Sequence, residues 1–339
     1  MEGIFASIPT PYYPDERIYL RKLEANQARL SRSQIAGMVV LGSTGEASML
    51  TDAETAEVLR VAAEATAPEK ALIAGVGRES VRATLELAEV AASNQYDAIL
   101  VRPPSYYASL CSPEALKHYY YSVADRSPLP LIVYHVPHCI PVEMSVELIA
   151  ELAQHPKIIA VKDSSGQIDR IRALVEATQN APRRTVPMTK NLAAVTARML
   201  APKPATGSDF VAASDLTAST VAARTKEIGF QILCGTASIF LEALMAGATG
   251  GVLAFASIAP EVTQEIYLSW KQHDQKLAEE HQRHVTPANR RIVGELGIGA
   301  LKYACDFNGY YGGYPRSPLL APTAEQKKEI ENLLTEIRN

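Results

Sequence analysis

One short stretch of the chain combines a reactive side chain with an apolar setting. Residues 158–161 are Ile-Ile-Ala-Val, Lys162 follows directly, and Asp-Ser-Ser-Gly occupies 163–166. An apolar run bounded by Pro156 and Gly166 is typical of a strand buried on both faces. A lysine at the end of such a strand loses hydration, which favours its neutral amine. A neutral amine is the nucleophile that attacks a ketone and forms a Schiff base.

A structural role is the simpler interpretation of Lys162. Its long side chain can reach water at the strand end and pair with the carboxylate of Asp163. Taken alone, the stretch favours this structural role. The pattern in the rest of the chain reverses that preference.

Polar residues also follow other apolar runs. Gly42, Ser43 and Thr44 join a predicted strand to a predicted helix, where backbone N–H groups and hydroxyls can hold a small carboxylate. An ordinary helix-capping turn is the alternative. Tyr134 ends another run, and its phenol can carry a proton to or from a substrate hydroxyl, although a core tyrosine is equally compatible. Two histidines that flank Tyr134, His135 and His138, are further candidates to line a pocket.

The elements that must position these residues follow a regular alternation. Apolar runs typical of buried strands alternate with helix-like stretches, and the eight runs are residues 3–10, 37–41, 71–77, 98–102, 131–134, 158–162, 231–236 and 250–256. Eight strand–helix pairs predict an α/β protein with a (β/α)8 TIM barrel. A doubly wound open sheet is the competitor, but it often carries a glycine-rich fingerprint after its first strand, and Thr10-Pro11-Tyr12 stands there instead. In a barrel, the polar residues above meet at one rim.

Two segments exceed a minimal barrel. We assign residues 1–275 to the barrel, with an insertion at about 181–229 between the sixth helix and the seventh strand, and 276–339 to a C-terminal helical extension. The insertion follows a helix and precedes a strand, so it should emerge at the bottom of the barrel, away from a site on the top face. We therefore expect a structural or interface role for it. Its residues 191–200 and 215–228 look helical.

Composition excludes several function classes. The chain has 339 residues, 47% of them hydrophobic, and a net charge of −4, which does not suggest binding to nucleic acid or to a membrane. We see no signal peptide and no apolar run long enough to span a bilayer, and we expect a cytoplasmic protein. The four cysteines are far apart and lack metal-ligand spacing, so we expect free thiols and no metal site.

Several motifs together resemble one known family. Residues 42–46 (GSTGE), 134–137 (YHVP), 155–166 (HPKIIAVKDSSG) and 247–252 (GATGGV) resemble the dihydrodipicolinate synthase / N-acetylneuraminate lyase family of pyruvate-dependent class I aldolases. The resemblance covers nearly the whole chain apart from the insertion. The tail at 309–313 (GYYGG) is similar to that of 4-hydroxy-2-oxoglutarate aldolases.

The resemblance implies a role for each matching residue. Lys162 would form the Schiff base with pyruvate or a longer 2-oxo acid, so that no separate cofactor is needed, and Tyr134 would move protons above the imine. Ser43 and Thr44 would bind the pyruvyl carboxylate, with Thr44 also in the proton relay. Tyr106 or Tyr107 would complete the relay from a neighbouring subunit, since members are commonly dimers or tetramers. Gly235 and Leu253 would line the pocket through their backbones.

The chain also departs from the family pattern. Cys139 stands where dihydrodipicolinate synthases have an arginine that holds the carboxylate of the aldehyde substrate, and a thiol cannot make that bidentate contact. We expect Cys139 to be a small buried residue. Arg102 can supply a substitute charge, although a rim arginine paired with a surface carboxylate is the simpler interpretation.

These observations favour one function and leave three alternatives. The favoured function is a carbon–carbon lyase that joins or releases pyruvate and an aldehyde, most like 4-hydroxy-2-oxoglutarate aldolase. The alternatives are dihydrodipicolinate synthase, a barrel that binds a 2-oxo acid or sugar acid without turnover, and a metal-dependent aldolase.

Overall fold

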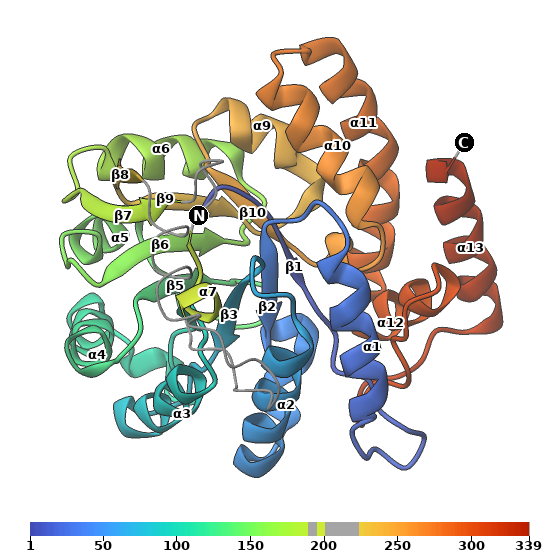
Figure 1. The fold of residues 1–339 in the computed structure, drawn as a ribbon, viewed down its shortest axis with the longest axis horizontal. Coiled ribbons are helices and arrows are strands. Elements are labelled where there is room, and N and C mark those ends of the chain that lie inside the picture. Colours follow the sequence, from blue (N-terminus) through green and yellow to red (C-terminus); the bar gives the residue numbers. More distant parts are fainter. Residues whose placement is uncertain (189–194, 201–223, 339) are drawn as a thin grey trace, which may run out of the picture.

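The computed structural model describes residues 1–188, 195–200 and 224–338, and its centre is a closed barrel of eight parallel strands (Figure 1). Around the ring the strands follow the order β1-β10-β9-β6-β5-β4-β3-β2. Their bounds are β1 (Gly3–Ser7), β2 (Gly37–Val40), β3 (Ala71–Gly75), β4 (Ala98–Val101), β5 (Leu131–His135), β6 (Ile158–Asp163), β9 (Gln231–Cys234) and β10 (Gly250–Leu253). The predicted (β/α)8 barrel is confirmed, and the open sheet is excluded because the ring closes between β1 and β10.

Helices surround the barrel, and each leads the chain back to the end of the barrel where the strands begin. Their bounds are α1 (Leu20–Ser31), α2 (Asp52–Ala65), α3 (Val81–Ser93), α4 (Pro113–Arg126), α5 (Val146–Leu152), α6 (Ile168–Thr178), α9 (Phe240–Met245) and α10 (Pro260–Lys271). Hydroxyl side chains cap four of them, because each accepts a hydrogen bond from the backbone N–H three residues on. The caps are Thr51, Ser80, Ser112 and Ser145. Local sequence thus fixes the start of four of the eight helices just beyond the rim that carries the candidate site.

The strands are buried on both faces, as their continuous apolar runs predict. Every residue of β2, β4, β5, β9 and β10 is buried. Side chains of a strand alternate between the barrel interior and the surrounding helices, so each strand contributes to two apolar layers. The position of a polar residue in this alternation therefore decides whether its side chain points into the barrel or toward the helices.

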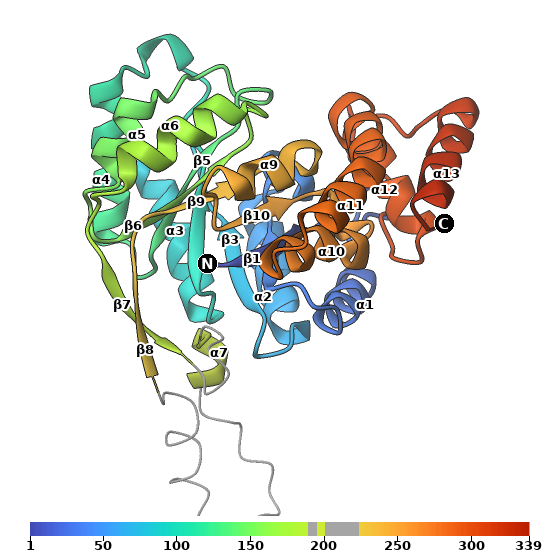
Figure 2. The ribbon, with the colours of Figure 1, turned by 90° about the horizontal axis from the view of Figure 1, so that it is seen from above.

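The C-terminal segment adds helices on one side of the barrel (Figures 1 and 2). It consists of α11 (Gln275–Ala288), a π-helical stretch (Asn289–Glu295), α12 (Gly297–Phe307) and α13 (Ala324–Arg338). Arg291 of the π-helical stretch pairs with Glu329 of α13 at 2.8 Å, which ties these helices together. Lys302 of α12 is fully buried and pairs with Glu46, beside the rim of the barrel.

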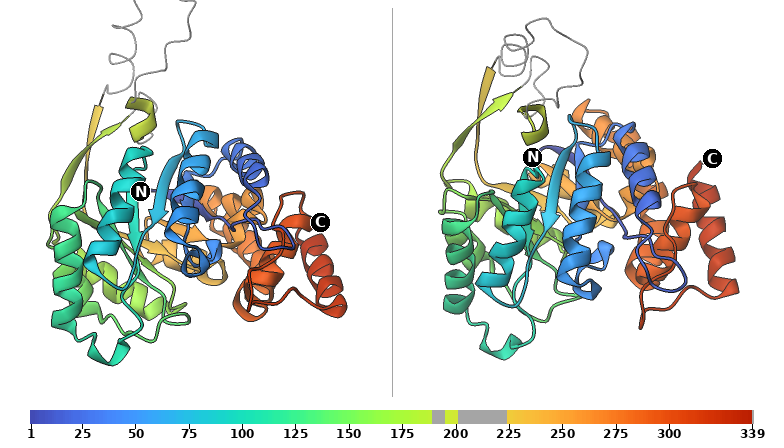
Figure 3. Two further views of the ribbon diagram at one scale, coloured as in Figure 1. Left: turned by 90° about the horizontal axis from the view of Figure 1, so that it is seen from below. Right: turned by 60° about the horizontal axis from the view of Figure 1, so that its bottom comes forward.

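The described part of the insertion forms a two-stranded arm and a short helix (Figures 2 and 3). Strand β7 (Arg184–Met188) pairs antiparallel with β8 (Arg224–Ile228), and α7 (Ala197–Leu200) lies between them in sequence. The backbone N–H of Ala197 donates to Asp97, directly before β4, so α7 lies at the N-terminal end of the barrel strands. This end is opposite the rim of the candidate site.

The helix predicted over 215–228 is wrong for its last five residues, which form β8. Backbone pairing with β7 and a hydrogen bond from Thr185 to Glu227 (2.6 Å) stabilise an extended conformation that local helix propensity did not indicate. Residues 215–223 lie outside the described part of the chain. Of the helix predicted over 191–200, residues 197–200 are helical, and 191–194 are outside the described part.

No described helix is long and apolar enough to cross a membrane.

Candidate active site

Lys162 and Tyr134 meet at the C-terminal ends of neighbouring strands. Lys162 lies near the end of β6 with 3% of its surface exposed, and its backbone is the register partner of Tyr134 on β5. The ammonium Nζ lies 4.1 Å from the centroid of the tyrosine ring. The lysine does not reach water, so the structural role in which it snorkels to solvent is wrong.

Asp163 is not the partner of Lys162, because successive strand residues point to opposite faces. Its carboxylate accepts hydrogen bonds from His135 Nδ1 (2.9 Å) and from Arg170 Nε of α6 (2.7 Å), and Ser165 donates to its other oxygen. Burial alone would raise the pKa of Asp163, but the hydrogen bonds from these three partners outweigh it and lower the pKa to about 2. His135 therefore serves this buried cluster and does not line the pocket.

The Ser43 loop faces the tyrosine from the opposite side of the site. Residues Ser43–Gly45 form a single 3-10 turn after β2, and the loop then turns through Glu46 in the left-handed conformation (φ 56°). The hydroxyls of Ser43 and Tyr134 lie 3.2 Å apart, within hydrogen-bond distance. Thr44 is buried, and the hydroxyl of Thr10 donates to the Gly45 carbonyl at 2.7 Å, which fixes the turn. The loop and the phenol are thus linked before any substrate binds.

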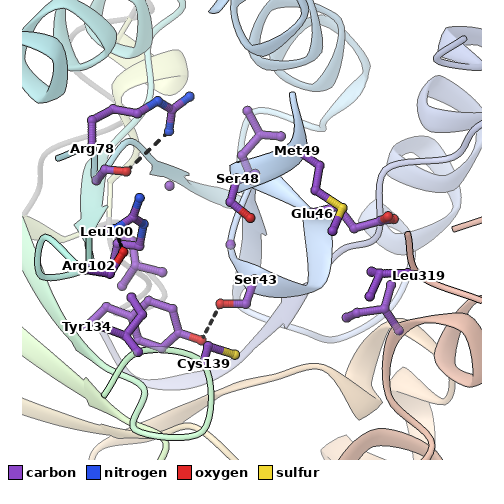
Figure 4. A pocket seen from close by; sticks show the side chains of 18 residues that line it. Ser43, Glu46, Ser48, Met49, Arg78, Leu100, Arg102, Tyr134, Cys139 and Leu319 are labelled. Atoms are coloured by element: carbon purple, nitrogen blue, oxygen red, sulfur yellow. Dashed lines mark hydrogen bonds between the residues drawn. The ribbon is translucent and has the colours of Figure 1, made fainter. Parts of the chain in front are cut away.

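A cavity of about 350 Å³ opens over this arrangement (Figure 4). Gly42, Ser43 and Tyr134 line it, as predicted. Cys139 lines it as well and is exposed, so the expectation of a small buried residue is wrong. The thiol is exposed because residues 137–139 form a turn beyond β5.

Four other predicted residues lie outside the cavity lining. They are Lys162, Thr44, Gly235 and Leu253. Lys162 lies beneath the Tyr134 ring, and Leu253 ends β10 fully buried. The N–H of Gly235 donates to the Asp163 carbonyl at 2.7 Å, and a Cβ there would approach Ser164 Oγ to 2.0 Å. Gly235 is therefore needed for close packing of the β6 and β9 ends.

Tyr106 and Tyr107 lie away from the cavity of their own chain. Their side chains are 81% and 66% exposed, and their rings contact each other edge to face at 5.0 Å. The backbone N–H of Tyr106 donates to Glu79, which fixes the loop after β4 while both phenols face solvent.

Sequence reasoning missed one pair of ions at the rim. Glu46 lines the cavity and pairs with Lys302, and both side chains are almost completely buried. Burial lowers the pKa of Lys302 to about 8, although the carboxylate of Glu46 opposes the shift. No local signal marked this pair, because the two residues are 256 positions apart in the chain.

Arg78 is a third residue that sequence reasoning missed. It follows Gly75-Val76-Gly77 at the end of β3 and lines the cavity together with Arg102. Its position one step beyond a predicted strand was a usable signal, since every such position belongs to the same rim.

All four cysteines are free thiols, as predicted. Within residues 1–188, 195–200 and 224–338, histidine, cysteine, aspartate and glutamate do not gather in groups of three that could hold a metal ion.

Comparison with known proteins gives a consistent result over the whole chain. The family model described as the dihydrodipicolinate synthetase family matches residues 1–183 and 180–337. A 4-hydroxy-tetrahydrodipicolinate synthase from Acidiphilium cryptum is 29% identical, with 96% of this chain and 94% of the relative covered. An L-threo-3-deoxy-hexylosonate aldolase from Hypocrea jecorina is 28% identical, with 94% and 90% covered.

A solved structure shows the same fold. The dihydrodipicolinate synthase from Acinetobacter baumannii, complexed with pyruvate, superposes with a TM-score of 0.80 at 23% identity and covers 99% of this chain and 98% of its own. At this level of identity the match concerns the fold.

Fold and site together define a (β/α)8-barrel enzyme whose polar residues gather at the C-terminal ends of the strands. The chain belongs to the dihydrodipicolinate synthetase family, and it is an aldolase-type carbon–carbon lyase.

Proposed function

We propose that this chain is a Schiff-base aldolase that releases pyruvate from a 4-hydroxy-2-oxo acid, or joins pyruvate to an aldehyde. The observation that carries the proposal is the position of Lys162 Nζ, buried 4.1 Å from the ring centroid of Tyr134. A buried amine beside a phenol supplies both the nucleophile and the proton carrier that imine formation needs.

The reaction balances with the residues at hand. The Lys162 amine attacks the C2 carbonyl, and Tyr134 gives its proton to the departing hydroxyl, so that water leaves with a protonated imine and a Tyr134 phenolate remaining. The imine withdraws electrons, so the C3–C4 bond breaks, the 4-hydroxyl loses its proton to Tyr134, and the aldehyde departs. The remaining enamine is protonated at C3, and hydrolysis of the imine frees pyruvate and the lysine. The covalent imine is the electron sink, so the proposal needs no cofactor.

The Ser43 loop would hold the substrate carboxylate in this scheme. Gly42 and Ser43 line the cavity, and the Ser43 hydroxyl lies 3.2 Å from the phenol of Tyr134. Donors fixed before binding stabilise charge without reorganisation. Thr44 is buried next to Ser43 and would relay the proton.

Assembly and location belong to the same proposal. Tyr106 or Tyr107 would enter the site of a neighbouring subunit in a dimer or tetramer, since both are exposed and neither lines its own cavity. The cytoplasm remains the expected location.

Two observations favour 4-hydroxy-2-oxoglutarate as the kind of substrate. The tail Gly309–Gly313 resembles that of aldolases for this compound, and the exposed thiol of Cys139 lies in the cavity wall in place of an arginine. Dihydrodipicolinate synthase activity is the second candidate, because a relative named 4-hydroxy-tetrahydrodipicolinate synthase is 29% identical. Condensation of pyruvate with aspartate semialdehyde, faster than cleavage of 4-hydroxy-2-oxoglutarate, would favour this candidate.

Borohydride reduction in the presence of pyruvate tests the proposal. We expect a mass increase on the wild-type chain, mapped to the peptide that contains Lys162, and no increase on Lys162→Ala. Lys157→Ala is a matched control, since Lys157 lies at the opposite end of the same region, before β6. Folded wild-type protein without an adduct would contradict the mechanism. Saturable binding of 2-oxo acids without any product would then support a binding barrel.

A further inference from the structure

Two arginines lie at the ends of neighbouring strands and line one side of the cavity. Arg78 follows β3 and Arg102 follows β4, and both contribute to the lining. A Cβ on Gly77 would lie 2.6 Å from the backbone nitrogen of Arg102, so this glycine allows the two strand ends to approach closely. Figure 4 shows both arginines on the side of the cavity away from Ser48 and Met49.

The backbone of Arg78 is held firmly in place. Its N–H donates to Thr84 Oγ1 (3.0 Å), and its carbonyl accepts from the hydroxyl of Tyr119 (2.9 Å). The side chain donates to Thr55 Oγ1 and to the Gly77 carbonyl. The backbone of Arg78 is therefore fixed, and the two hydrogen bonds of its guanidinium group go to uncharged oxygens, which do not neutralise its charge.

The positive charges of this pair are only partly neutralised. Arg102 pairs with Glu79 at 3.0 Å, but the Glu79 carboxylate also accepts hydrogen bonds from the loop residues Ser105 and Tyr106. The carboxylate nearest to Arg78 is Asp52 at 3.6 Å, and its side chain is 80% exposed. Burial lowers the pKa of Arg78, Asp52 opposes the shift, and the charge of Arg102 lowers it further, as expected for two adjacent cations.

The other charge in the cavity wall does not cancel these cations. Glu46 is the acidic residue of the lining, and it pairs with the buried Lys302 and accepts the backbone N–H of Arg316. Its carboxylate is thus already neutralised from outside the cavity. Of the charged residues that line the cavity, Arg78 and Arg102 are therefore the two whose carboxylate partners are exposed to solvent.

We propose that Arg78 and Arg102 form a binding site for the distal carboxylate of the substrate, at the end remote from the imine carbon. The inference rests on the proposed function and adds the residues that would select a dicarboxylic substrate. Two guanidinium groups present planar forks that match carboxylate oxygens, and partial burial strengthens each charge-assisted hydrogen bond. A cavity of about 350 Å³ suits a small ligand that reaches from Tyr134 to this pair.

Two substrates that differ only in the distal group distinguish carboxylate binding by the arginines from a purely structural role. 4-Hydroxy-2-oxoglutarate and 4-hydroxy-2-oxopentanoate differ only in a distal carboxylate or methyl group. We expect Arg78→Ala and Arg102→Ala to lower the ratio of their kcat/KM values by about 10- to 100-fold, because hydrogen bonds to a charged group are lost for one substrate alone. Arg78→Lys should retain part of the preference. Arg82→Ala is the matched control, since Arg82 on α3 is 90% exposed and pairs with Glu86.

The outcomes distinguish this inference from the proposed function. An unchanged ratio in both alanine variants, with pyruvate still trapped on Lys162, would overturn the inference and leave the aldolase intact. If the wild-type chain cleaves neither substrate, calorimetry with glutarate and pentanoate tests the binding site by itself. Glutarate binding that the Arg78→Ala/Arg102→Ala variant loses would support the site. Absent glutarate binding, or equal binding by both proteins, would refute it.

Discussion

Lys162 and Tyr134 are register partners on β6 and β5, and the lysine ammonium lies 4.1 Å from the tyrosine ring centroid. The pairing of two strands therefore places the proposed nucleophile and the phenol side by side, without help from a flexible loop. The next register pair, His135 and Asp163, points to the opposite face and forms the buried cluster with Arg170. One strand pair thus carries the proposed chemistry on its inner face and a stabilising ion cluster on its outer face.

Replacement of Tyr134 by phenylalanine distinguishes the role of the hydroxyl from that of the ring, because it removes only the hydroxyl. The ring face over Lys162 is retained, so borohydride should still trap pyruvate, but more slowly, because the hydroxyl no longer supplies the proton for the loss of water. Turnover should fall by about 10²- to 10⁴-fold, because a positioned proton carrier contributes a factor of that size. Steady-state kinetics and trapping on the same sample provide the measurement. Loss of trapping together with turnover would show that the hydroxyl is needed for imine formation itself.

Ser43→Ala removes a hydroxyl that lies 3.2 Å from the phenol and beside the proposed carboxylate site. We expect KM for the 2-oxo acid to rise about tenfold, since one hydrogen bond to a charged group is lost. Ser48→Ala is the control, because Ser48 lines the cavity from the next turn of the same loop. Equal changes in both variants would argue against a specific role for Ser43.

The barrel could be predicted from the sequence because its signal is repeated. Each of the eight strands is a short apolar run followed by a helix, and a local error in one element does not alter the count. The rule that strand ends share one rim also predicts that Ser43, Tyr134 and Lys162 lie close together. Side-chain partners were less predictable. Asp163 follows Lys162 in sequence but points to the other face, where its partners come from β5 and α6.

The remaining features were not predicted because they depend on contacts between residues that are distant in the sequence. Lys302 and Glu46 meet only because α12 packs beside the rim, and no spacing in the sequence records that contact. Strand β8 forms because β7 supplies its hydrogen-bond partners, although its residues are compatible with a helix. Cys139 was expected inside on the basis of residue type, but the turn after β5 exposes it.

The Asp163 cluster should make stability depend on acid pH. The pKa of Asp163 is about 2 in the folded chain, below its ordinary value, so the carboxylate stabilises the fold above pH 4. This contribution of about 2 kcal/mol is lost as the pH falls from about 4 to about 2. Asp163→Asn should be less stable at pH 7 and should lose less stability over that range, as measured by denaturant unfolding. Asp169→Asn, at a 90% exposed position, should behave like the wild type.

The exposed tyrosines predict a specific form of complementation. The chain has a mass of 36.7 kDa, and light scattering should report a multiple of it. If a phenol crosses into a neighbouring site, Tyr106→Phe or Tyr107→Phe should lower turnover, although neither residue lines its own cavity. The affected tyrosine variant should regain activity when it is mixed and reassembled with inactive Lys162→Ala. In a mixed oligomer, some sites combine Lys162 of the tyrosine variant with the intact tyrosine of the Lys162→Ala chain. A monomer in solution, or mixtures without recovery, would contradict the shared site.

The buried pair of Glu46 and Lys302 connects the C-terminal helices to the Ser43 loop. Lys302→Met leaves the Glu46 carboxylate buried without its cation, and we expect a loss of about 3–5 kcal/mol of unfolding free energy. Glu46→Gln should also be destabilising, because an ammonium then remains buried. The double variant removes both charges and should be more stable than the sum of the single changes predicts, and denaturant titration of all four proteins measures this coupling. Strictly additive losses would mean that the two charges are stabilised independently, by Tyr314 and Arg316, which also contact them through the backbone.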